Sequence, residues 1–256
     1  MNTNNNQLVQ VSTSDGLYLH GYYSPSCDKK TALLHIHGSE GNFYENNFIY
    51  VLEKHLNENN IAFLTVNTRG NGLTTDFNTV NGKIKTIGTQ KELLEEAHLD
   101  ISAWIKFLIE EGYQEIILQG HSLGTMKVIR YLFEGEHKDK VKKLILLAPF
   151  EKVRLPELSP ETQESWAGSS DFARVFDFTS EDYDFPILKQ IKIPTKIIVG
   201  EKDEYFYPTN PNDFQKIMDL LLNHIPNSQG VFIPDAVHSF KPNEELMAKE
   251  VINFIK

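Results

Sequence analysis

Short apolar runs alternate with segments of helical periodicity along most of the chain. Apolar or β-branched runs between polar turns predict strands, and apolar positions three or four residues apart predict helices. The predicted strands span residues 7–12, 17–24, 32–36, 61–66, 115–119, 143–147, 195–199 and 230–233. The predicted helices span residues 43–56, 93–110, 123–133, 211–222 and 243–255. Apolar strands that alternate with helices indicate an α/β fold, with a mostly parallel central sheet and helices on both faces.

Two segments depart from this alternation. Residues 67–90 are polar and contain four glycines, and we expect a long loop there. Residues 151–190 interrupt the order of strands and helices. A segment of about forty residues rarely folds alone, so it is expected to form a small cap, or lid, over the sheet. Residues 1–150 and 191–256 then form the core of one α/β domain.

Composition narrows the class of protein. The chain of 256 residues carries a net charge of −10, which disfavours binding to the phosphate backbone of nucleic acid. The single cysteine, Cys27, excludes an intrachain disulfide, and no apolar run is long enough to span a membrane. These features predict a cytoplasmic protein without a membrane span, and they leave its oligomeric state open.

The strongest chemical signal is the sequence Gly120-His121-Ser122-Leu123-Gly124. It fits the pattern G-x-S-x-G and lies between a predicted strand and a predicted helix, where a sharp turn would expose the serine hydroxyl at the carboxyl edge of the sheet. Glycines on both sides allow neighbouring backbone to approach closely. Ser122 is therefore the candidate nucleophile, and His121 is expected to pack within the turn.

From about Gln7 to the C-terminus, the order of elements and motifs resembles the α/β-hydrolase superfamily. In that family the acid and the histidine follow the nucleophile along the chain. The turn after the predicted strand at 195–199 resembles the family's G-x-x-D pattern, so the resemblance assigns the acid to Asp203. The competing carboxylates in the neighbouring turns are Glu201, Glu204 and Asp235.

The resemblance also assigns the catalytic histidine to His238. The turn after the last predicted strand resembles the family's G-x-x-H-x-F pattern, with Asp235 where glycine is common. In such a triad the histidine takes the proton of the serine hydroxyl during attack, and the aspartate fixes the histidine tautomer. The expected catalytic residues are therefore Ser122, Asp203 and His238.

A second glycine-containing loop follows the predicted strand at 32–36. Residues 37–42 resemble the family's H-G-x-x-G oxyanion loop, in which His37 is expected to order the loop. Attack on an acyl group places negative charge on oxygen, which two backbone N–H groups would stabilise. By position these are the amides of Ser39 and Leu123, and the sequence leaves Glu40 open as an alternative to Ser39.

The segment at residues 67–72 resembles the family's D-x-R-G-x-G pattern, with Asn67 where aspartate is frequent. We expect Arg69 to tie loops together rather than to bind substrate. The sequence contains no recognised metal-binding or nucleotide-binding motif, so neither a metal site nor a cofactor is expected.

These residues predict a serine hydrolase that cleaves a carboxylic ester through an acyl-enzyme intermediate. Its expected partner is a small-molecule ester, and thioesters and amides stay open as substrates. One alternative is acyl transfer to an alcohol by the same nucleophile. Another is a non-catalytic binding module on the hydrolase scaffold, because a fold does not dictate a function. The filled triad positions favour an enzyme.

Overall fold

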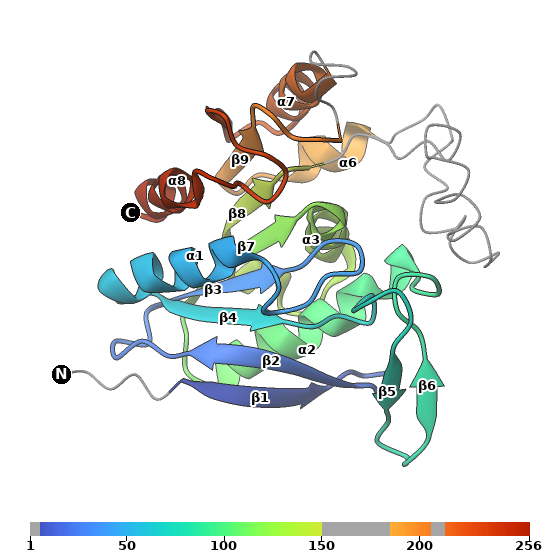
Figure 1. Cartoon of the computed structure of the whole chain (residues 1–256). Coiled ribbons are helices and arrows are strands. Elements are labelled where there is room, and N and C mark those ends of the chain that lie inside the picture. The colour runs from blue at the N-terminus through green and yellow to red at the C-terminus, as the bar shows by residue number, and fades with distance from the viewer. Residues whose placement is uncertain (1–5, 150–184, 206–212) are drawn as a thin grey trace.

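The computed structural model describes residues 6–149, 185–205 and 213–256. Within these residues eight strands form one sheet in the order β1-β2-β4-β3-β7-β8-β9-β10 (Figure 1). The strands are β1 (Gln7–Ser12), β2 (Tyr18–Ser24), β3 (Thr31–Ile36), β4 (Ala62–Val66), β7 (Glu115–His121), β8 (Val141–Leu147), β9 (Thr195–Gly200) and β10 (Ser228–Ile233). The predicted α/β fold is confirmed.

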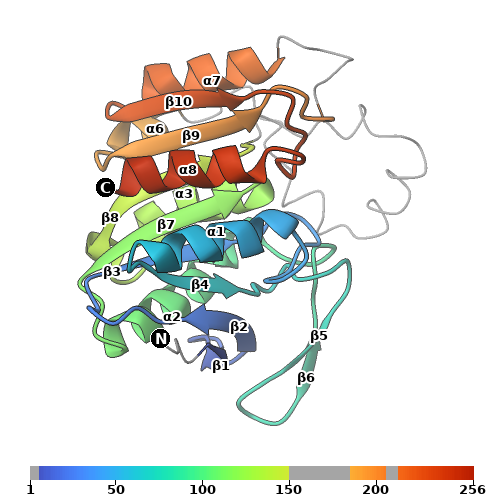
Figure 2. The same cartoon turned by 60° about the vertical axis from the view of Figure 1, so that its left-hand side comes forward.

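Helices cover both faces of this sheet (Figure 2). The longer helices are α1 (Asn47–Glu58), α2 (Ala97–Glu110), α3 (Leu123–Glu134), α7 (Asp213–His224) and α8 (Glu244–Ile255). Shorter turns of helix are η1 (Leu94–Glu96), η2 (Lys138–Lys140) and α6 (Phe185–Gln190).

Alternation of side chains along each strand divides the apolar core into two layers. Leu33 packs with Phe48 of α1 and with residues of α8 on one face of the sheet. Leu34 packs with Trp104 of α2 and with residues of α3 and α7 on the other face. Successive strand residues point to opposite faces, so a strand between two helical layers is mostly apolar, with buried polar exceptions such as His35 of β3 and Gln119 of β7.

In this sheet β3, β4, β7, β8, β9 and β10 are parallel to one another, whereas β1 and β2 pair antiparallel with their neighbours. Parallel strands bring their carboxyl ends to one edge, which is the edge where ligands bind in open α/β sheets. Figure 2 shows the ends of β7, β9 and β10 at that edge. The turns that follow these strands carry the candidate catalytic residues.

The predicted loop at residues 67–90 is wrong in one respect, because it contains a short antiparallel hairpin. Its strands are β5 (Asp76–Asn78) and β6 (Ile84–Thr86). The hairpin projects from the body of the protein (Figure 1). Phe77 is its buried residue, whereas Val80 and Ile84 are exposed. With so little apolar burial the segment has no strand-like sequence pattern.

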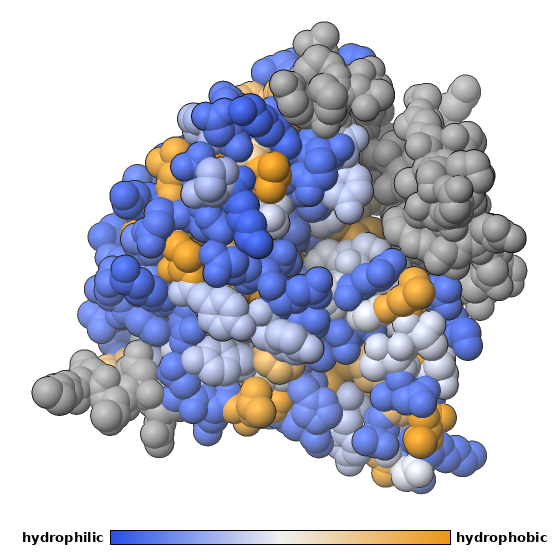
Figure 3. All heavy atoms as spheres, viewed as in Figure 1, coloured by the Kyte–Doolittle hydropathy of each residue, from blue (hydrophilic) through white to orange (hydrophobic). Residues whose placement is uncertain are grey.

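On the face drawn in Figure 3, most of the surface is hydrophilic and apolar residues form small, separate spots.

Helix α1 begins at Asn47, four residues later than predicted. The preceding residues are held by loop contacts instead: the Phe43 N–H donates to the Asn67 side chain at 3.2 Å, and the Tyr44 N–H donates to the Asn42 side chain at 3.0 Å. Asparagine side chains compete with the helix for backbone groups in this way.

The predicted cap at residues 151–190 lies largely outside the described residues, which resume with α6. The division of the chain into a core and a cap therefore stays a prediction. In the part of the chain that the structure describes, no helix is both long and apolar enough to cross a bilayer.

Candidate active site

Ser122 lies on a strained turn between β7 and α3. Its φ of 55° and ψ of −127° are unusual for a residue with a side chain. The Ser122 N–H donates to the Leu147 carbonyl at 2.9 Å, which fixes the turn against β8. A Cβ atom at Gly120 would lie 2.4 Å from the Gly124 carbonyl oxygen, so only glycine fits there. The turn thus has the geometry that the G-x-S-x-G pattern predicted.

The glycine loop after β3 lies directly beside Ser122. A Cβ atom at Gly38 would be 3.1 Å from Ser122 Oγ. The Glu40 N–H donates to Thr89 Oγ1 at 2.7 Å and is therefore occupied. Within the described residues, the N–H groups of Ser39 and Leu123 donate to no protein group. Leu123 is also the first residue of α3, and the N-terminus of a helix favours negative charge.

The predicted acid and histidine meet at the same edge of the sheet. His238 Nδ1 lies 2.8 Å from Asp203 Oδ2, and the Asp203 side chain is fully buried. An ionised carboxylate can only accept, so Nδ1 carries the hydrogen and Nε2 is left as the basic nitrogen. This pair joins turns that follow β9 and β10.

In the described part of the chain, two of the competing carboxylates bind groups other than the imidazole ring of His238. Asp235 pairs with Lys202 at 2.6 Å, and both side chains are exposed. Glu204 Oε2 accepts the backbone N–H of His238 at 2.7 Å. Glu201 is exposed in the same turn. Among these candidates, Asp203 is therefore the carboxylate that contacts Nδ1 of His238 in the described part of the chain.

The turn that carries Ser122 contacts the turn that carries His238 through His121. His121 Nε2 lies 3.0 Å from the His238 carbonyl oxygen, and the two imidazole centroids are 4.9 Å apart. His121 is also packed against the rings of Phe48 and Phe240. The predicted packing of His121 is confirmed, and its hydrogen bond to His238 is an addition that the sequence did not reveal.

A buried polar chain holds the glycine loop from beneath. His37 Nδ1 lies 2.7 Å from the Gly38 carbonyl oxygen, and His37 Nε2 accepts the Thr68 N–H at 3.1 Å. Lys127 Nζ donates to Thr68 Oγ1 at 3.2 Å and pairs with Glu92 at 2.7 Å. The predicted ordering role of His37 is confirmed. Lys127 and Glu92 were missed, because nothing in their local sequence shows that two distant residues meet in the interior.

Electrostatics fixes the protonation state of His37. Burial, and then the neighbouring Lys127 ammonium, lower the pKa of His37 to about 3. The ring is therefore neutral at physiological pH, with its hydrogen on Nδ1, where it donates to Gly38. A neutral ring in this tautomer satisfies both of its nitrogens.

We expect Lys127→Met to lower the free energy of unfolding by about 3–5 kcal/mol near neutral pH, because it strands the Glu92 carboxylate in the interior. Burial raises the pKa of Glu92, and the Lys127 ammonium opposes that rise. A carboxyl whose pKa is higher in the folded than in the unfolded protein destabilises the fold at high pH and does so less as pH falls. The deficit should therefore shrink when denaturant unfolding is repeated at lower pH.

Two comparisons sharpen this experiment. Adding Glu92→Gln to the Lys127→Met variant removes the stranded charge and should restore part of the stability. Lys106→Met breaks an exposed ion pair with Glu110 and should change stability by no more than about 1 kcal/mol. If Lys127→Met lowered the free energy of unfolding by the same amount at every pH, a stranded Glu92 carboxylate would not be the cause of the lost stability.

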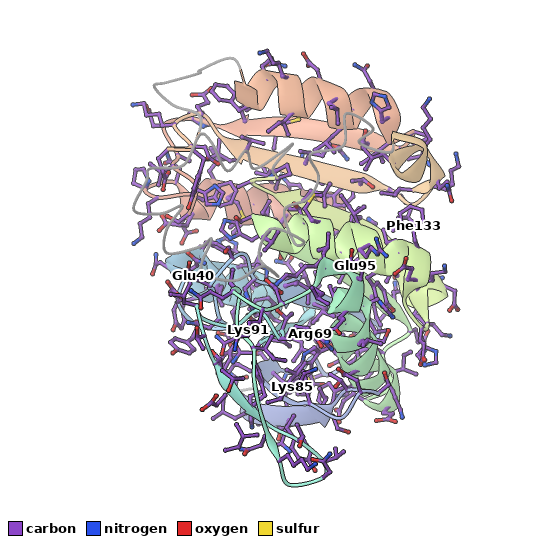
Figure 4. All side chains as sticks on the ribbon, turned by 90° about the vertical axis from the view of Figure 1, so that its right-hand side faces the viewer. Glu40, Arg69, Lys85, Lys91, Glu95 and Phe133 are labelled. Atoms are coloured by element: carbon purple, nitrogen blue, oxygen red, sulfur yellow. The ribbon has the colours of Figure 1, made fainter. Side chains whose placement is uncertain are left out.

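Arg69 is structural, as predicted. It is fully buried and binds Asp100 of α2 through two nitrogens, with its Nη2 2.8 Å from Asp100 Oδ1. It also pairs with Glu96 and with Asp15 of the β1–β2 turn. Figure 4 shows Arg69 beside α2. The arginine thus joins the loop after β4 to a helix and a hairpin.

Among the described residues, no group of three His, Cys, Asp or Glu side chains is arranged to hold a metal ion.

The sheet order and the positions of these turns place the protein in the α/β-hydrolase superfamily, as the resemblance indicated. More narrowly, the family described as "Serine aminopeptidase, S33" matches residues 28–175, which is more than half of the chain. The chain belongs to that family. No curated protein matches it in sequence.

Solved structures share the fold over nearly the whole chain. Est1E from Butyrivibrio proteoclasticus, solved with ferulic acid, has a TM-score of 0.69 and 20% identity, covering 96% of this chain and 98% of that one. An esterase from Pyrococcus furiosus has a TM-score of 0.67 and 18% identity, covering 98% and 90%. An esterase from Exiguobacterium antarcticum has a TM-score of 0.66 and 18% identity, covering 96% and 98%. At such identities the likeness defines the fold alone.

Proposed function

We propose that this protein is a serine hydrolase that cleaves carboxylic esters of small molecules. The observation that carries the proposal is the buried hydrogen bond between Asp203 and His238, formed beside the strained turn of Ser122. The esterases among proteins of the same fold support an ester as substrate.

In the proposed reaction Ser122 Oγ attacks the ester carbonyl carbon while His238 Nε2 takes the hydroxyl proton. The carbonyl oxygen becomes negative, and the amides of Ser39 and Leu123 donate to it. Because the Glu40 amide already donates to Thr89, Ser39 is the better candidate for the second donor. The intermediate then expels the alcohol, which receives the proton from His238.

The second half of the reaction returns the enzyme to its starting state. Water attacks the carbonyl carbon of the acyl group that is bound to Ser122 Oγ, and it gives a proton to His238 Nε2. The serine oxygen then leaves with that proton as the acid product departs. Asp203 stays ionised throughout and stabilises the imidazolium form of His238 in both halves.

We expect a fluorophosphonate probe to label the protein once, at Ser122, and p-nitrophenyl esters to be hydrolysed. Intact-mass and peptide mass spectrometry locate the label, and a panel of acyl chains with an added feruloyl ester tests the acyl group. A matched anilide and an added alcohol separate esterase activity from amide cleavage and from acyl transfer. A folded protein that neither labels nor hydrolyses any ester would be a binding module instead.

A further inference from the structure

Three consecutive residues after β9 contact His238. Asp203 accepts the hydrogen of the ring nitrogen Nδ1 at 2.8 Å. Glu204 Oε2 accepts the backbone N–H of the same histidine at 2.7 Å. The Tyr205 ring packs edge-on against the imidazole, with centroids 4.5 Å apart. The ring and the backbone of His238 are thus held by different side chains of one turn.

The nucleophile turn holds the other backbone group of His238. His121 Nε2 lies 3.0 Å from the His238 carbonyl oxygen, and since a carbonyl can only accept, Nε2 carries the hydrogen. Phe48 and Phe240 pack around the His121 ring. Burial, and then the His238 imidazole, hold the pKa of His121 well below its ordinary value, so the ring stays neutral.

We propose that His121 and Glu204 are positioning residues, which fix the backbone of His238 and thereby set how its imidazole reaches Ser122. The inference rests on the proposed function of Ser122 and His238. It assigns a role to one chain neighbour of each of two predicted triad residues: His121 precedes the nucleophile, and Glu204 follows the acid.

The physical reason is that one hydrogen bond cannot place a ring. Asp203 holds Nδ1, but the ring can still pivot about that contact if the histidine backbone shifts. Glu204 and His121 clamp the N–H and the carbonyl of residue 238, so the Cα position is fixed from two other turns. A displacement of about 1 Å between reacting groups can lower a rate about 10²-fold.

The test at Glu204 compares two substitutions. Glu204→Ala removes the acceptor, and we expect kcat to fall about 10- to 100-fold with KM unchanged. Glu204→Gln keeps an amide oxygen that accepts the N–H, so its kcat should stay close to that of the wild type. Glu201→Ala, an exposed carboxylate in the same turn, is the matched control. If Glu204→Gln were as slow as Glu204→Ala, with the acidic limb of the pH profile displaced, Glu204 would act through its charge and the proposal would be wrong.

The test at His121 follows the same logic. His121→Leu keeps apolar bulk between the two phenylalanines but removes the donor, and its kcat should fall by a similar factor. His121→Gln keeps an N–H donor and should recover most of the rate. Thermal unfolding of each variant shows whether the fold is retained. Wild-type kcat in both folded variants, Glu204→Ala and His121→Leu, would overturn the proposal.

A second measurement separates this inference from the proposed function. The proton shared by His238 and Asp203 should give a downfield imidazole resonance in the NMR spectrum of the wild type. It should persist in Glu204→Gln and shift or broaden in Glu204→Ala. A wild type that is inert towards esters and fluorophosphonate would refute the hydrolase, yet this resonance would still report the positioning. An unchanged resonance in Glu204→Ala would refute the positioning alone.

Discussion

Replacing Ser122 by alanine should lower kcat for ester hydrolysis by about 10⁴–10⁶-fold and abolish fluorophosphonate labelling. In the proposed mechanism the substitution removes the oxygen that forms the acyl-enzyme bond and keeps the amides of Ser39 and Leu123, which would bind the carbonyl oxygen. KM should therefore change little. Stopped-flow and steady-state assays with a p-nitrophenyl ester measure both quantities.

The control for this variant is the same substitution at a serine that lies at the opposite edge of the sheet, away from the proposed site. Ser228 begins β10, and its hydroxyl donates to the Ile225 carbonyl at 2.7 Å. Ser228→Ala should keep full labelling and turnover. Undiminished labelling of Ser122→Ala would show that another residue is the nucleophile.

Asp203→Asn should lower kcat by about 10⁴-fold without unfolding the protein. An amide side chain can donate a hydrogen bond to Nδ1 of His238, which would place the ring hydrogen on Nε2. The nitrogen that must take the serine proton would then already carry one. Because the substitution preserves shape, the loss should appear in kcat and in the labelling rate.

Asp235→Asn is the informative comparison, since Asp235 was a competing acid in the sequence. Its carboxylate is exposed and pairs with Lys202 rather than with the histidine. Exposed ion pairs contribute little, so this variant should retain the wild-type rate. A larger loss at Asp235 than at Asp203 would reverse the assignment of the acid.

The places of the candidate catalytic residues in the fold could be predicted, because each lies in a turn after a strand that the apolar pattern identifies. Ser122 has a local motif, and His238 follows the last predicted strand. The acid was harder, since four carboxylates occupy two turns and chain order alone does not measure distance. The structure separates them by contact: Asp203 binds the ring and Glu204 binds the backbone.

What the sequence did not reveal depends on contacts between distant segments. Lys127 has the sequence context of an ordinary helical residue, yet it is buried against Glu92 beneath the glycine loop that follows β3. The hairpin of β5 and β6 escaped prediction for the opposite reason, because its strands are short and mostly exposed. The spacing of apolar residues shows which face of a single helix or strand is buried. It shows neither an ion pair between distant segments nor a short, exposed hairpin.

The separation along the chain of the three turns that carry the proposed catalytic residues has a consequence for how the protein folds. Asp203 and His238 are 35 residues apart in the chain, and Ser122 belongs to a turn that precedes β8, β9 and β10. No local segment holds enough of the site to react. Recovery of ester turnover after dilution from denaturant would therefore time the closing of long-range strand contacts, whereas far-ultraviolet circular dichroism follows helices that form from neighbouring residues. A lag between the two signals would measure the life of a state with helices in place but the sheet incomplete.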